Sequence, residues 1–219
     1  MHIDQLAFAS RFDGISGSAI REIFKLLAVP GMISFAGGNP AAAALPDQQA
    51  AELARELLLE KGKVLLQYGA TEGYAPLKES LAPYLQERFS FSCAPDEILP
   101  VTGSTQAMDL LCKALINPGD KVVVEDPTFL GNMQCIKLYQ AELLPVPSDE
   151  AGVRVDLLEE VFRTQHPKLF YVIPTFQNPT GRTLTGERRK ALAIMAAKTG
   201  FVITEDDPYR DLRYSGEAL

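Results

Sequence analysis

The sequence predicts an α/β fold, a three-layer sandwich with a mostly parallel sheet. Two observations predict it. From about residue 97 onward, short apolar runs alternate with segments of helical spacing. Such alternation is typical of parallel strands joined by helices that cover both faces of the sheet. In addition, each apolar run passes directly into polar, Gly or Pro residues, as strands do where they leave a sheet.

The first hundred residues carry helical patterns separated by loops. Helices are expected over 18–31, 47–61 and 75–88, since apolar residues recur there every three or four positions. Pro30-Gly31 and Gly62 are expected to end the first two. Residues 32–46 and 66–74 are expected to form loops.

The later part supplies the sheet. Strands are expected over 97–103, 121–127, 141–147, 168–174 and 200–206. Helices are expected between them, over 104–117, 129–139, 156–165 and 187–199. In the first of these helices one shared face is expected to hold Ala107, Leu110, Leu111, Ala114 and Leu115.

Composition and charge argue against several classes of function. The 219 residues carry a net charge of −7 and no basic tract, which argues against nucleic acid as a partner. No apolar run approaches the roughly 20 residues of a membrane span. The first residues lack a basic region followed by an apolar core, so we expect a cytoplasmic protein. Two histidines and three cysteines lie too far apart in the sequence to predict a metal site.

Ligands of open parallel sheets bind at the carboxyl ends of the strands, and the polar residues there are informative. Gly103, Ser104, Thr105 and Gln106 follow the first expected strand and open a helix. Free N–H groups and two hydroxyls at a helix start suit a phosphate. An ordinary N-cap by Ser104 or Thr105 is the alternative.

Two further strand ends offer one contact each. Phe129 follows the second strand and either stacks on a flat ligand or joins the core. Asn178, in an Asn-Pro-Thr-Gly sequence, either aims its amide at a ligand oxygen or only makes a turn.

The last expected strand runs into Glu205, Asp206 and Asp207. A carboxylate at the end of a buried strand requires a cation, and a protonated heterocyclic nitrogen would serve. The alternative is a helix N-cap with Pro208 at the first helical position. Together the four strand ends favour a flat, phosphorylated, cationic ligand, which describes pyridoxal 5′-phosphate.

The segments "TGSTQAMDLL", "PGDKVVVEDPTF", "PTFQNPTGRTLTGERRKAL" and "VITEDDPYRDLRY" resemble the class I/II aminotransferases, the fold-type-I pyridoxal-phosphate enzymes. "LQYGATEGYAPLKESLAPYL" and "ISFAGGNP" match as well. The resemblance is strongest to the aminoadipate/kynurenine aminotransferases. Aminotransferase-like domains of GntR-type regulators share the same motifs.

The resemblance implies a role for each matching residue. The turn Gly103, Ser104, Thr105 and Gln106 would hold the phosphate, Phe129 would stack on the ring, and Asp206 would pair with the ring nitrogen. Asn178 and Tyr209 would face the ring hydroxyl, and Asn178 would also reach the substrate carboxylate. Tyr68 would reach the phosphate of a neighbouring subunit in a homodimer, and Gly38 would line the substrate side. A cis Asn178-Pro179 bond is also implied.

The resemblance also implies an organisation. Residues 1–45 would form an N-terminal arm and helix of a small domain, and residues 46–219 a large cofactor-binding domain. The family's Schiff-base lysine lies beyond the Asp-x-Pro-Tyr segment, and the last lysine here is Lys198. We therefore expect the N-terminal half of an aminotransferase that transfers an amino group from an amino acid to a 2-oxo acid. A regulatory sensor domain, another reaction on the same fold, and an inactive truncated product remain alternatives.

Overall fold

The computed structural model describes residues 7–13, 31, 33, 38 and 40–217. The chain divides into two compact units, one made of residues 1–15 and 101–219 and the other of residues 16–100. The division expected at residue 45 follows the family's two domains rather than compactness, and it stays a prediction.

The unit of residues 16–100 is helical where it is described. Its elements are η4 (Ala42–Ala44), α2 (Asp47–Leu65), α3 (Ala75–Phe89) and η5 (Pro95–Glu97). The helix expected over 18–31 lies outside the described residues apart from Gly31. Helix α3 runs one residue beyond the predicted end at Arg88, to Phe89, and the left-handed φ of 54° at Ser90 closes its last turn.

Gly62 does not end helix α2, contrary to expectation. The helix continues to Leu65, and the N–H of Leu66 still bonds to the carbonyl of Gly62 at 3.0 Å. A glycine inside a helix costs only about 1 kcal/mol relative to alanine, which the flanking Leu, Glu and Lys residues outweigh.

The other unit contains a five-stranded sheet. The strands are β1 (Lys121–Asp126), β2 (Glu142–Asp149), β3 (Gly152–Val153), β4 (Leu169–Val172) and β5 (Val202–Glu205), in the order β3-β2-β1-β4-β5. Strands β2, β1, β4 and β5 are parallel, and the short β3 is antiparallel to β2. The sheet is therefore mostly parallel, as predicted.

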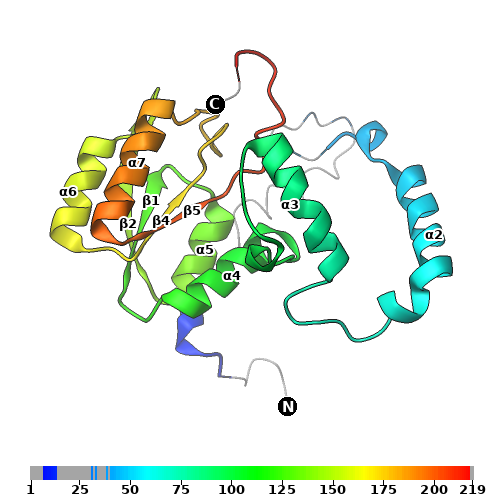
Figure 1. The fold of residues 1–219 in the computed structure, drawn as a ribbon. Helices are drawn as coiled ribbons and strands as arrows, with labels where there is room; N and C mark the ends of the chain where they lie inside the picture. The colour runs from blue at the N-terminus through cyan, green and yellow to red at the C-terminus, as the bar shows by residue number, and fades with distance from the viewer. Residues whose placement is uncertain (1–6, 14–30, 32, 34–37, 39, 218–219) are drawn as a thin grey trace. The chain divides into compact units, whose positions relative to one another are not determined.

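Helices cover both faces of this sheet (Figure 1). They are α4 (Gly103–Leu115), α5 (Leu130–Leu138), α6 (Val155–Gln165) and α7 (Gly186–Thr199), and a short turn, η2 (Ser10–Phe12), precedes them. Helices α4 and α5 pack on one face, α6 and α7 on the other. The three-layer sandwich is confirmed.

The strands alternate their side chains between the two layers. In β4, Leu169 and Tyr171 join the apolar cluster of α4 and α5, whereas Phe170 and Val172 join that of α6 and α7. All four are fully buried. A strand buried on both faces reads as a continuous apolar run, which is why these strands could be located from the sequence.

One expectation for this region was wrong. Residues 98–102 have no regular structure and pair with no described strand, so 97–103 is not a strand. Pro100 offers no N–H for a ladder. Helix α4 buries Met108 and Cys112, whereas Leu110 of the expected face is 37% exposed. The face with Met108 and Cys112 and the face with Leu110 are both apolar. Spacing alone therefore did not decide which face of α4 packs on the sheet.

Within the described ranges, no helix combines the length and apolar character needed to cross a membrane.

Candidate functional site

The carboxyl ends of three strands lie next to one another. Val172 at the end of β4 pairs with Glu205 at the end of β5, and β1 runs parallel to β4 with Val124 opposite Tyr171. The residues that follow each strand therefore leave the sheet at one edge. Among these residues are three that the sequence singled out, Phe129, Asn178 and Asp206.

Helix α4 points its first turn toward the same edge. Only five residues, 116–120, join its last residue to β1, and Lys168, just before β4, places its Nζ 3.4 Å from the carbonyl of Leu115. The end of α4 thus lies at the amino ends of the strands. A helix that starts from the opposite edge brings Gly103–Gln106 to the carboxyl ends.

The start of α4 has the features of an anion site. Thr102 is the N-cap residue and makes no side-chain cap, so the alternative of a cap by Ser104 or Thr105 is wrong. Gly103 has a left-handed φ of +80° and open space where a Cβ would stand. Residues 103–106 are exposed. Gln106 Oε1 accepts from the N–H of Thr102, and the N–H groups of residues 103–105, at the positive end of the helix dipole, have no side-chain acceptor among the described residues.

Asp206 lies just beyond β5 and is held by two neutral donors. The Nδ2 group of Asn132 donates to Asp206 Oδ2 at 2.9 Å and to the Tyr171 hydroxyl at 3.0 Å. That hydroxyl donates to the same Oδ2 at 2.9 Å. The N–H of Asp206 bonds to the carbonyl of Val172. Both side-chain bonds end on Oδ2, so Oδ1 is the oxygen that the described residues leave for another partner.

The half-buried carboxylate of Asp206 lacks a cation among the described residues. Burial raises its pKa, and the charge of Asp207 adds to this, whereas the hydrogen bonds from Tyr171 and Asn132 lower it. No positively charged side chain of the described part of the chain contributes. A carboxylate so placed gains most from a cationic ligand.

The neighbouring acids differ from Asp206 in this respect. Asp207 pairs with Arg210, with 2.9 Å between Nε and Oδ2. Glu205 is exposed and is attracted to the partly buried guanidinium of Arg189. Both of these acids therefore have an arginine of the described residues near them, whereas Asp206 has none.

Phe129 forms the N-cap position of α5, next to a cis Asp126-Pro127 bond. Its half-buried ring packs on the apolar cluster of α4 and α5. The ring also lies directly over Gly131, where an added Cβ would come within 2.7 Å of it. Only glycine lets the aromatic ring lie so close to the first turn of α5.

Asn178 and Tyr209 lie together, with 3.1 Å between the Asn178 Nδ2 and the Tyr209 hydroxyl oxygen. The Asn178-Pro179 bond is cis, which confirms the expectation drawn from the resemblance. Tyr209 packs against the same apolar cluster as Phe129. The four strand-end residues and the α4 turn thus belong to one edge of one unit.

The class I and II aminotransferase family matches residues 30–218 of the chain. The chain belongs to this family. It is 44% identical over 212 residues to the 2-aminoadipate transaminase of Thermus thermophilus and 42% identical over 217 residues to an aromatic-amino-acid aminotransferase of Thermococcus litoralis. Each match covers 97% of this chain and 52% of the relative.

A solved structure agrees. The kynurenine aminotransferase of Pyrococcus horikoshii matches with a TM-score of 0.88 and 37% identity, over 96% of this chain and 53% of that one. The chain spans about half the length of the relatives it matches. The five-stranded unit is accordingly part of the large domain of a fold-type-I aminotransferase.

Two residues expected at the aminotransferase site belong to the other compact unit. Tyr68 is fully exposed, and Gly38 has open space around it, with nothing within 4 Å of the point where a Cβ would stand. Their roles toward a neighbouring subunit and toward substrate stay predictions.

Sequence reasoning missed four residues of this edge, namely Asn132, Tyr171, Glu125 and Gln177. Each stands inside a pattern read as apolar helix, apolar strand or turn. A polar side chain within a buried pattern was the available signal, because such a group must find a hydrogen-bond partner.

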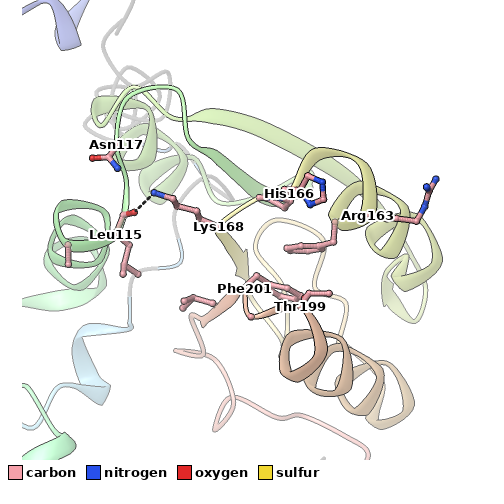
Figure 2. Close-up of a pocket in the computed structure, with 12 residues that line it drawn as sticks. Leu115, Asn117, Arg163, His166, Lys168, Thr199 and Phe201 are labelled. Atoms are coloured by element: carbon pink, nitrogen blue, oxygen red, sulfur yellow. Dashed lines mark hydrogen bonds between the residues drawn. The ribbon is translucent and has the colours of Figure 1, made fainter.

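A separate hollow of about 760 Å³ lies at the opposite edge of the sheet, at the amino ends of β4 and β5 (Figure 2). Arg163, His166 and Lys168 line it beside the stacked rings of Phe162 and Phe201. Lys168 is paired with Asp120 at 2.6 Å, and Arg163 with Glu160 at 2.6 Å. Lys168 and Arg163 are thus engaged in ion pairs, and the hollow includes none of the strand-end residues described above.

Proposed function

We propose that this chain forms the pyridoxal-phosphate-binding part of an aminotransferase that transfers an amino group between an amino acid and a 2-oxo acid. The observation that carries the proposal is Asp206, a half-buried carboxylate with two neutral donors on Oδ2 and no cation from the described residues. A protonated pyridine nitrogen is a cation of the right size and shape for Oδ1.

The residues present fit this cofactor. The first turn of α4, where Thr102 makes no side-chain cap, would hold the phosphate with the hydroxyls of Ser104 and Thr105. Phe129 would stack on the pyridine ring. Asn178 and Tyr209, already within hydrogen-bond distance of each other, would face the ring hydroxyl, and Asn178 also the substrate carboxylate.

In this arrangement Asp206 would control the protonation of the cofactor's ring nitrogen. When bound, pyridoxal phosphate supplies an electron sink to the substrate. The Asp206 carboxylate would hold the proton on the ring nitrogen by raising that nitrogen's pKa. Asn132 and Tyr171 favour the ionised form of Asp206 against its burial, because both donate to it.

The wider assembly remains part of the proposal. We infer a homodimer in which Tyr68 reaches the neighbouring subunit's phosphate and Gly38 lines the substrate side. The relatives act, by their names, on aromatic amino acids and 2-aminoadipate, and we propose an amino acid of that range as substrate. The 219 residues alone hold no lysine after Lys198, so for them we propose noncovalent cofactor binding and no useful transamination.

A sensor role without chemistry, as in aminotransferase-like domains of regulators, would use the same cofactor site. Turnover of an amino acid by a longer form of the protein would separate the two, since a sensor binds the cofactor and leaves the amino acid unchanged.

The test is the affinity of the chain for pyridoxal phosphate, measured through the change in the cofactor's absorbance on binding. Asp206→Asn keeps the shape and removes the charge. We expect it to weaken binding about 10- to 100-fold, since a hydrogen bond to a charged group contributes about 1.5–3 kcal/mol.

Glu205→Gln is the matched control. It also removes a negative charge, but from an exposed side chain one residue before Asp206. It should bind as the unchanged chain does. Equal affinities for the Asp206→Asn and Glu205→Gln variants would exclude Asp206 as the nitrogen's partner.

A further inference from the structure

Two loops that carry proposed cofactor contacts meet at one buried side chain, Gln177. Its Nε2 donates to the carbonyl of Pro127 at 2.8 Å, in the loop that leads to Phe129. Its Oε1 accepts from the N–H of Thr180 at 2.9 Å and from the Thr180 hydroxyl at 2.7 Å, in the loop that holds Asn178. Gln177 is only 4% exposed. It therefore connects the exit of β1 to the exit of β4.

Glu125, the last buried residue of β1, holds this glutamine in turn. It is 3% exposed, and its Oε2 accepts from the N–H of Ile173 at 2.9 Å. The side-chain amide of Gln177 also lowers the pKa of Glu125, as a donor group turned toward that carboxyl does.

We propose that Glu125 and Gln177 are positioning residues, a buried carboxyl–amide pair that sets the loops of Phe129 and Asn178 for cofactor binding and does so more firmly when Glu125 is ionised. The proposal rests on the proposed function, because those loops are assigned to the cofactor there.

The hydrogen bonds explain the dependence on charge. An ionised Glu125 accepts from the N–H of Ile173 and attracts the donor side of the Gln177 amide. Protonation turns one of its oxygens into a donor, but the amide group of Gln177 that faces it can only donate. Turning the amide round would break both bonds to Thr180. The protonated carboxyl therefore holds the glutamine less well.

The surroundings of Glu125 place its ionisation near neutral pH. Burial raises the pKa of Glu125 to about 7, against the lowering effect of the bonds from Ile173 and Gln177. The charge of Glu125 raises the pKa of one neighbouring titratable group, the Tyr171 hydroxyl on β4. That hydroxyl donates to Asp206 beyond β5. No cation of the described residues contributes to the pKa of Glu125.

The test is the affinity for pyridoxal phosphate across about pH 5.5 to 8.5, for the unchanged chain and for Glu125→Gln, which mimics the neutral form. The affinity ratio of the two cancels the cofactor's own titration. We expect a ratio near one at the acid end that rises to about tenfold above pH 7. Glu142→Gln, at an exposed strand start, is the control and should give a constant ratio.

A constant ratio for Glu125→Gln would overturn the inference while leaving the proposed function intact. Absence of any cofactor binding by the unchanged chain would instead count against the proposed function. A second, ligand-free measurement then decides the inference: the NMR signals of the Gln177 side-chain amide. We expect them to shift with a midpoint near pH 7, and signals that do not move would overturn the proposal.

Discussion

At the scale of single residues, consecutive acids can have unrelated roles. Asp207 meets Arg210, and Glu205 faces outward near Arg189. Asp206 meets two neutral donors. Side chains of neighbouring residues at a strand end point in different directions, so each carboxylate has its own surroundings. The middle one alone has no cation near it among the described residues, which is why we propose it as the partner of a cationic ligand.

Gly131 gives a prediction at this scale. Gly131→Ala would place a Cβ 2.7 Å from the Phe129 ring and force the ring to move. We expect the affinity for pyridoxal phosphate to fall about three- to tenfold, the range of one aromatic stacking contact, with the fold retained. Cofactor titration and a thermal unfolding curve measure the two effects.

Gly186→Ala is the matched control, since it also lies in the first turn of a helix and has open space around its Cβ position. It should leave cofactor affinity unchanged and stabilise α7 by about 0.5–1 kcal/mol. Normal affinity in the Gly131→Ala chain would mean that Phe129 does not stack on the cofactor.

Part of the candidate site was predictable, because polar or aromatic residues follow strands that the sequence pattern had located. Asp206, Asn178 and Phe129 each follow a strand that the apolar pattern located correctly. Asn132 and Tyr171 could not be predicted as partners of Asp206, because they lie 74 and 35 positions from it in the sequence and meet it only in the folded unit. Spacing within one segment carries no information about such contacts.

At the scale of elements, Arg188 fastens α7 to the β2–β3 hairpin. Its guanidinium contacts both oxygens of Asp149, at 2.7 and 2.8 Å, and donates to the carbonyls of Gly152 and Val153. The guanidinium holds the pKa of Asp149 at about 2. One side chain therefore joins the outer helix to the edge of the sheet.

We predict that Arg188→Met lowers the thermal unfolding midpoint by roughly 3–6 °C, because several charged hydrogen bonds are lost together. Arg163→Met removes an arginine whose pair with Glu160 lies on the exposed face of α6, and it should change the midpoint little. Calorimetry of both variants checks this. Equal midpoints would show that α7 is held by apolar packing alone.

Elements were predictable where a segment is buried on both sides and less so elsewhere. The continuous apolar runs at β1 and β4 are buried on both faces of the sheet and have no other interpretation. Residues 98–102 carry an equally apolar pattern but have no described strand beside them, and a strand exists only through its neighbour. The two-residue β3 is too short for any periodic pattern.

At the scale of the whole molecule, the buried Glu125 makes stability depend on pH. Its pKa is 4.5 when unfolded and about 7 in the folded chain, mainly through burial. Between these values the folded state keeps a proton that the unfolded state has released. The free energy of unfolding should therefore fall as pH rises from about 4.5 to about 7, by up to about 3 kcal/mol. The raised pKa of Asp206 acts with the same sign.

Glu125→Gln should flatten this slope, and urea unfolding at a series of pH values measures it. Asp149 and Asp156 have lowered pKa values of about 2, so their contributions are lost at more acid pH, outside this window. An unchanged slope would show that Glu125 is already ionised at pH 5. Stability and cofactor binding are thus expected to have opposite preferences for the charge of this carboxyl.

The parallel pairing of β5 also divides its backbone amides into two classes. The N–H groups of Val202 and Asp206 bond to carbonyls at the start and end of β4, and those of the residues between alternate in direction. In the described sheet β5 is an edge strand, so amides that point away from β4 exchange their hydrogens with water readily. Asp206 belongs to the protected class. The residue proposed to hold the cofactor's ring is thus anchored at its backbone before any ligand arrives, just beyond the strand that forms one edge of the described sheet.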